Sequence, residues 1–226
     1  MIVGIHQPNF LPWFGFFYKI SLCDVFVILD TVDIELGSAK SITHRTRIKT
    51  NTGSNWLSIP LIKSDSKIIK DVLINNSVDW KSKMLKTVYY QYRKSNHFDF
   101  FYTIFEEIIN EKTEHLADLN IKAISKISNI LSLNVPIIKS SGLNINSTDR
   151  NLRLIEICNS QDANIYISGK GGKKYNNEVL FQKNNIKIQY VEFNHPIYEQ
   201  LWGDFIPNLS IIDLLFNCGK DSKNYF

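Results

Sequence analysis

The stretch IVGIHQPNFLPWFGFFYKISLCDVFVILD (residues 2–30) decides the fold. It opens on IVGI (residues 2–5), a short β-branched run that predicts a buried strand. FGFFYKISLC (residues 14–23) predicts a helix with an aromatic face. DVFVILD (residues 24–30) predicts a second strand, with five consecutive apolar residues between two aspartates. Such a run is typical of parallel sheets that are buried on both faces, so this stretch predicts a βαβ unit.

The patterns that follow extend this unit toward the C-terminus. The polar, basic stretch Val32–Thr50 predicts an extended loop, WLSIPLI (residues 56–62) an edge strand because of Pro60, and residues 66–75 fit another strand. Apolar residues at helical spacing fill residues 79–133. An α/β pattern returns after Pro136, with helices predicted at 147–161, 176–185 and 210–219 and strands at 164–169 and 186–193.

Together these elements predict the α/β class. We expect a mostly parallel, three-layer, Rossmann-like sheet with a helical insertion in the middle of the chain. The 226 residues are enough to bury a sizeable core, and we expect one domain over residues 1–226 with a helical subdomain at about 79–133.

Composition excludes several function classes. A net charge of +4, with lysines scattered along the chain, does not favour a dedicated nucleic-acid binder. The three widely spaced cysteines lie in apolar runs and predict reduced thiols. No charged leader precedes an apolar run, and no run reaches about 18 apolar residues. We therefore expect a cytoplasmic protein without stable membrane insertion.

Chemistry-bearing residues follow several predicted strands. Since parallel sheets place their sites at the carboxyl ends of strands, His6, Asp30, Ser168 and His195 are expected along one edge. His6 or His195 is suited to act as base or acid near neutral pH, and Asp30 completes the catalytic candidates. The alternative for His195 is a ring that bonds a carbonyl and packs on Tyr198. Binding of a divalent ion by the two histidines and Asp30 is the weaker reading, so no metal is predicted.

Two basic stretches favour anion binding. In YISGKGGKKY (residues 166–175), glycines let backbone N–H groups approach a phosphate or carboxylate. The spacing fits neither a P-loop nor a dinucleotide fingerprint, and a tight turn with solvated lysines is the alternative. In THRTRIKT (residues 43–50), Arg45, Arg47 and Lys49 share one face of an extended segment and are placed to clamp a diphosphate. A solvated charged loop is the alternative.

Asp213 lies within an otherwise apolar predicted helix. A buried carboxylate needs a partner, and it either orients a histidine or arginine or satisfies a backbone amide. The sequence contains no GxSxG, HExxH or CxxC motif, so it predicts no covalent mechanism.

Several motifs, taken in order, resemble the WbqC-like family over nearly the whole chain. They are HQPNFLPWFGFFYKI, DVFVILD, RIKT with a following tryptophan, YISGKGGKKY, HPIYEQ and LSIIDLLFNCG. The resemblance implies a bacterial enzyme of surface-polysaccharide biosynthesis (O-antigen, capsule or lipopolysaccharide) that makes or modifies a nucleotide-linked deoxyamino sugar. The family usually has an asparagine-rich pattern before RIK, where this chain reads ITHRT (residues 42–46), so substrate contacts there are expected to differ.

The resemblance also implies site residues. With those from the strand ends and turns, the predicted substrate-binding residues are Gln7, Asn9, Trp13, Lys19, Arg47, Lys49, Ser168, Gly169, Lys170, Gly171, Tyr175, Tyr198, Gln200, Asp213 and Asn217. Structural roles are expected for Pro8, Pro196 and Ser210, the last as a helix N-cap.

Three functions remain open from the sequence. The leading one is a transferase that joins an acyl or aminoacyl group to the amine of a nucleotide-linked sugar, with an acyl donor as second partner. The second is an ATP-using nucleotidyltransferase or amide ligase, in which a histidine after the first strand touches phosphates; those enzymes have a second histidine three residues on, where this chain has Asn9. The third is a non-catalytic binding protein. No cofactor or oligomeric state is predicted.

Overall fold

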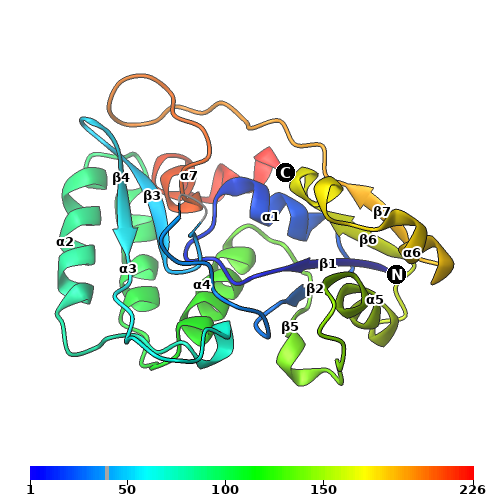
Figure 1. Ribbon diagram of the computed structural model, residues 1–226. Coiled ribbons are helices and arrows are strands. Elements are labelled where there is room, and N and C mark those ends of the chain that lie inside the picture. Colours follow the sequence, from blue (N-terminus) through cyan, green and yellow to red (C-terminus); the bar gives the residue numbers. More distant parts are fainter. Residues whose placement is uncertain (39–40) are drawn as a thin grey trace.

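Five parallel strands form the central sheet of the computed structural model, which describes residues 1–38 and 41–226 (Figure 1). Their order is β5-β2-β1-β6-β7. The bounds are Ile2–His6 for β1, Val25–Ile28 for β2, Ile137–Lys139 for β5, Ile165–Ser168 for β6 and Lys187–Tyr190 for β7. From β1 the chain adds β2 and β5 on one side and then β6 and β7 on the other. The strand order therefore reverses between β1 and β6, and the crevice outside their carboxyl ends is the topological switch point of the sheet.

Helices cover both faces of this sheet, because its central strands are apolar on both sides. Val3 and Ile5 of β1 pack on one face with α5 (Arg150–Ser160) and α6 (Glu178–Lys183). Phe26 and Ile28 of β2 pack on the other face with α1 (Phe14–Ser21). The three-layer, Rossmann-like prediction is confirmed.

The helical insertion lies between β2 and β5. It consists of α2 (Trp80–Tyr92), α3 (Phe98–Ile109) and α4 (Leu116–Ile130), at the left of Figure 1. α7 (Ile211–Cys218) packs against them through Phe216, whose ring stacks on Tyr92 at 4.6 Å between centroids.

Two strands, β3 (Arg45–Thr50) and β4 (Gly53–Ser58), form an antiparallel hairpin beside these helices. The loop predicted for 32–50 is wrong over β3, because β4 supplies the ladder hydrogen bonds that the polar residues alone do not signal. Residues 39–40 of that predicted loop lie outside the described residues. β4 also ends before Pro60, and residues 66–75 contain a 3-10 turn rather than a strand.

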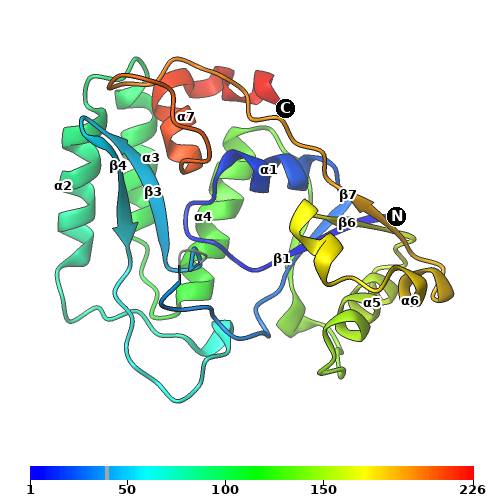
Figure 2. The ribbon, with the colours of Figure 1, turned by 45° about the horizontal axis from the view of Figure 1, so that its top comes forward.

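Hydrogen-bonding side chains begin two of the predicted helices, and the predicted Ser210 cap is confirmed. Asp149 accepts from the Leu152 N–H at 2.9 Å at the start of α5, and Ser210 accepts from the Ile212 N–H at 3.4 Å at the start of α7. Between β7 and α7, residues 191–209, which we call the connecting segment, run from the sheet to the hairpin (orange in Figures 1 and 2). Among the described residues, no helix combines the length and apolarity that crossing a bilayer requires.

Candidate functional site

A hollow of about 580 Å³ opens at the topological switch point, and we call it the first hollow. It lies against the ends of β1 and β6, the turn that follows β6, and the start of α5. Its polar or glycine lining residues are His6, Gln7, Lys19, Arg150, Arg153, Tyr166, Ser168, Gly169, Gly171 and Gly172. Six of the predicted site residues, His6, Gln7, Lys19, Ser168, Gly169 and Gly171, thus line one hollow.

A second hollow of about 510 Å³ shares four lining residues with the first, namely His6, Lys19, Gly169 and Gly171. Its other walls include Trp13, Lys170, Phe193, His195 and Asn208. Since His6 and Lys19 border both hollows, a ligand that spans the two must pass beside these side chains.

His6 ends β1 and is held in a defined tautomer. Its Nδ1 lies 3.0 Å from the Gln7 carbonyl oxygen, which only accepts, so Nδ1 carries the proton and Nε2 keeps its lone pair. The ring packs edge-on against Phe16 at 5.0 Å. Burial first, and the neighbouring Lys19 charge second, lower the pKa of His6 from 6.5 to about 4. The imidazole is therefore neutral at pH 7 and available as a proton acceptor.

Lys19 projects from α1 beneath the ends of the strands. Its Nζ donates to the Ile5 carbonyl oxygen at 2.7 Å and lies 5.8 Å from the centroid of the Tyr166 ring. Burial lowers the pKa of Lys19 from 10.5 to about 8, so most molecules still carry the charge at pH 7. A cation in this position favours an anion in either hollow.

The turn after β6 is a 3-10 segment, Lys170–Lys174. The first N–H groups of such a segment have no acceptor within it and can face an anion. A Cβ built on Gly169 or Gly171 meets nothing within 4 Å, whereas one on Gly172 comes within 2.2 Å of Ser168 Oγ. The first two glycines therefore border open space, and the third permits a close approach to Ser168, whose hydroxyl accepts from Asn176 Nδ2 at 3.0 Å.

Trp13 and His195 form the far wall of the second hollow. The Trp13 ring folds over Gly15, where a Cβ would come within 2.2 Å of the indole, and it packs edge-on against Phe193 at 5.2 Å. His195 Nδ1 donates to the Pro196 carbonyl oxygen at 2.8 Å, and the ring lies 6.4 Å from Tyr198. His195 thus fits both readings from the sequence, since its ring bonds a carbonyl and also faces a hollow.

A third hollow, of about 390 Å³, adjoins the second and shares Trp13 and Asn208 with it. It is lined by the predicted residues Asn9 and Arg47, and by Arg45 and Trp56 of the hairpin. Arg47 donates to Ser54 Oγ at 2.7 Å.

A different set of predicted residues forms a buried hydrogen-bonded cluster, which we call the Asp213 network. Both carboxylate oxygens of Asp213 are engaged, Oδ1 by the Tyr92 hydroxyl and Oδ2 by the Tyr198 hydroxyl, each at 2.8 Å. Lys49 Nζ donates to Gln200 Oε1 at 3.1 Å and to the Asp204 carbonyl oxygen. Lys49 therefore does not share a ligand-facing surface with Arg45 and Arg47.

Burial raises the pKa of Asp213, and the two tyrosine hydrogen bonds oppose that rise. Gln200 Nε2 donates to the Ile206 carbonyl oxygen at 3.0 Å, and Asn217 Nδ2 to the Asp213 carbonyl oxygen at 2.7 Å. Lys49, Tyr198, Gln200, Asp213 and Asn217 line none of the three hollows. The network instead fastens the connecting segment to the hairpin and to α7.

Asp30 and Tyr175 also lie apart from the hollows. Asp30 accepts from Ser140 Oγ at 2.8 Å, the Ser141 N–H at 2.9 Å and Ser141 Oγ at 2.6 Å, and so holds the turn after β5. Tyr175 is 53% exposed, with the Arg150 guanidinium 4.6 Å from its ring centroid. Within residues 1–38 and 41–226, no hydrogen bond joins Asp30 to the His6 ring, and Asp30 lines none of the three hollows.

Sequence reasoning missed three residues of the first hollow, Arg150, Arg153 and Tyr166. The arginines begin α5, and Arg153 also donates to the Ser147 and Thr148 carbonyl oxygens at 3.2 and 3.1 Å. They bring further positive charge beside the glycine turn. Their position directly after the Asp149 N-cap was the available signal, because this end of α5 meets the carboxyl edge of the sheet.

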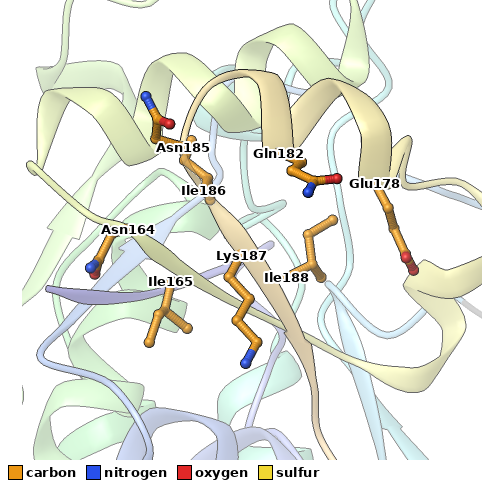
Figure 3. A pocket seen from close by; sticks show the side chains of 8 residues that line it. All are labelled: Asn164, Ile165, Glu178, Gln182, Asn185, Ile186, Lys187 and Ile188. Atoms are coloured by element: carbon orange, nitrogen blue, oxygen red, sulfur yellow. The ribbon is translucent and has the colours of Figure 1, made fainter.

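A further hollow, of about 640 Å³, lies at the edge of the sheet between β7 and α6 (Figure 3). Asn164, Gln182 and Lys187 are among the residues that border it, and none of the predicted site residues does. Among the described residues, no cluster of three or more histidine, cysteine, aspartate or glutamate side chains is arranged to hold a metal ion.

Comparison with known proteins places the chain in a family. An uncharacterized protein of Mycobacterium tuberculosis, Rv1507c, is 29% identical over 230 residues, which cover 99% of this chain and 96% of that protein. No solved structure matches the chain. The model of the WbqC-like protein family matches residues 7–225. The chain therefore belongs to the WbqC-like protein family.

Proposed function

We propose that this protein is an enzyme of bacterial surface-polysaccharide biosynthesis that transfers an acyl or aminoacyl group to the amine of a nucleotide-linked deoxyamino sugar. One observation carries the proposal: a neutral histidine with an unprotonated Nε2 stands between two joined hollows that are rich in positive charge. The resemblance of the sequence motifs to the WbqC-like family supports this class of pathway.

The cations of the hollows suit the diphosphate of such a substrate. Lys19, Lys170, Arg150 and Arg153 all line the first or second hollow, and no carboxylate of the described residues lines either. The N–H groups that open the glycine turn add donors to the same place. This set replaces the clamp that the sequence suggested, because Lys49 is occupied in the Asp213 network.

The proposed reaction requires a base. The amine nitrogen attacks the carbonyl carbon of an activated acyl donor, a C–N bond forms, and the bond to the leaving group breaks. The proton lost by the amine passes to Nε2 of His6 and then to the leaving group. An anionic diphosphate in the hollow raises the pKa of His6, because it offsets the Lys19 charge, and so makes the imidazole a stronger base.

The tetrahedral intermediate of this transfer carries a negative oxygen. Lys19 and the N–H groups of the glycine turn border the same space as His6 and are suited to stabilise that oxygen. Gln7 supplies a further donor in the first hollow. His195 lies on the opposite wall of the second hollow, where we assign it to substrate positioning.

Replacement of Lys19 tests the phosphate site. Lys19→Met keeps the apolar stem but removes the charge, and we expect binding of a nucleotide-linked sugar to weaken by about 10- to 100-fold. Lys86→Met is the matched control, since Lys86 is an exposed lysine of α2. Isothermal titration calorimetry measures both, and equal affinities for the two variants would contradict the proposal.

An ATP-using ligase or nucleotidyltransferase is the second candidate, favoured by the position of His6 at a switch-point crevice, where many α/β proteins bind nucleotides. Thermal unfolding separates the two. Stabilisation by a nucleotide-linked sugar but not by ATP with magnesium favours the transferase, and the reverse favours the ligase. Stabilisation by neither supports the non-catalytic binding protein.

A further inference from the structure

The third hollow contains polar groups that the proposed chemistry does not use. Asn9 is only 2% exposed and lines this hollow, yet its Nδ2 is buried with no hydrogen-bond partner among the described residues. A buried donor without a partner is uncommon and calls for a ligand or a bound water. The hollow also joins the second hollow at Trp13 and Asn208.

Its aromatic wall is flat and cationic. The Arg45 guanidinium lies over the Trp56 ring at 4.3 Å from the centroid, while its Nε and Nη2 donate to the Ser41 and Ser38 carbonyl oxygens. Arg45 is therefore held as a stacked planar cation rather than as an anion clamp. Trp56 is 38% exposed, which leaves part of the indole open to a ligand.

The hairpin and the loop after β1 fix this wall in place. The Thr46 hydroxyl donates to the Leu11 carbonyl oxygen at 3.0 Å, and the Phe10 N–H donates to the Ile42 carbonyl oxygen at 3.2 Å. In Figures 1 and 2 the β3–β4 hairpin lies beside that loop. The third hollow is thus bordered by elements that are bonded to one another.

We infer that the third hollow binds the nucleobase of the nucleotide-linked substrate. A stacked arginine and tryptophan offer a surface for an aromatic ring, and the amides of Asn9 and Asn208 are suited to bond the polar edge of a base. The order of the hollows fits a nucleotide that runs from the base in the third, past Trp13, to the diphosphate beside Lys19. This inference rests on the proposed function.

Calorimetry on the full chain tests the inference with inorganic pyrophosphate and with the diphosphates of uridine, thymidine, adenosine and guanosine. At least one nucleoside diphosphate should bind about tenfold or more tightly than pyrophosphate. Trp56→Ala should lower that affinity roughly 5- to 150-fold and leave pyrophosphate binding unchanged. Tyr90→Ala is the control, because Tyr90 is an exposed aromatic of α2.

Two further variants guard against a folding artefact. Trp56→Phe keeps a ring and should retain most of the preference for a nucleoside diphosphate over pyrophosphate. Asn9→Ala should reduce the differences among the four nucleoside diphosphates. Equal nucleoside diphosphate affinity in the wild type and in Trp56→Ala overturns the inference. A sugar 1-phosphate and uridine monophosphate are titrated as well. If Trp56→Ala weakens binding of the sugar 1-phosphate more than binding of uridine monophosphate, the third hollow binds the sugar and the inference is also overturned.

The two proposals fail in different ways. If pyrophosphate and all nucleoside diphosphates bind with equal affinity, and Lys19→Met weakens each, the inferred base site is contradicted and the proposed phosphate site stands. If neither pyrophosphate nor any nucleoside diphosphate binds, both the phosphate site and the base site are contradicted.

Discussion

The edge of the sheet around His6 and the Asp213 network differ in what their polar atoms bond to. At the edge, Nδ1 of His6 bonds the Gln7 carbonyl oxygen, while the ring lines a hollow and its Nε2 remains available to a ligand. In the network, both oxygens of Asp213 are taken by tyrosine hydroxyls. Polar side chains that satisfy one another stabilise the fold, whereas those left with bonding capacity beside a hollow are suited to ligands and chemistry.

The largest effect should come from His6→Asn, which removes the base but preserves a donor for the Gln7 carbonyl. We expect acyl transfer to fall by about 10²- to 10⁴-fold, with sugar-nucleotide binding retained. Product formation measured by mass spectrometry checks this. His115→Asn, at the start of α4, serves as the control histidine, and full activity in His6→Asn would place the base elsewhere.

The second largest effect should be a loss of stability when the Asp213 network is broken. Asp213→Ala leaves the buried hydroxyls of Tyr92 and Tyr198 without their acceptor, so the free energy of unfolding should fall by about 2–4 kcal/mol. Urea denaturation measures it. Asp118→Ala, which removes an exposed ion pair with Lys139, should cost under about 1 kcal/mol. A similar loss of unfolding free energy in both variants would show that the Asp213 network contributes no more to stability than an exposed ion pair.

The smallest effect is a dependence of stability on pH. The pKa of His6 is about 4 in the folded chain and 6.5 for an ordinary histidine, so between these values only the unfolded chain binds the proton. Its contribution to stability therefore rises with pH over this range. Relative to the wild type, His6→Asn should lose about 2 kcal/mol less stability between pH 7 and pH 5, as measured by urea denaturation. Parallel pH profiles for the two proteins would show that the ring titrates normally.

The sequence predicts the sheet well where a run of residues is buried on all sides. The four residues of β2 are all buried, as the continuous apolar run VFVI predicts. The cap at Ser210 also follows from local chemistry, because the side chain bonds a nearby amide. The β3–β4 hairpin does not, since its polar residues become a strand only when they pair with a partner.

The same limit applies to the site. His6 ends a strand and the glycine turn follows one, so their position at the carboxyl edge could be predicted. Lys49 and Arg47 look alike in sequence, yet Lys49 is buried against Gln200 while Arg47 borders the third hollow. Arg150 is brought to the first hollow by the packing of α5, and its place at the start of that helix signals this position only once the sheet edge is known. Whether a polar residue faces a partner or a hollow depends on contacts between distant segments.

The connecting segment lends the second hollow Phe193, His195 and Asn208 without belonging to the sheet. Side chains such as Gln200 and Lys49, rather than a ladder of strand pairs, attach this wall to the rest of the chain. The β6–β7 ladder ends at the Ser168–Tyr190 pair, so exchanges of side chains within residues 193–209 change no strand pair of the sheet. Exchanges of Phe193, His195 or Asn208 would therefore reshape this wall of the second hollow while the ends of β1 and β6 keep their positions.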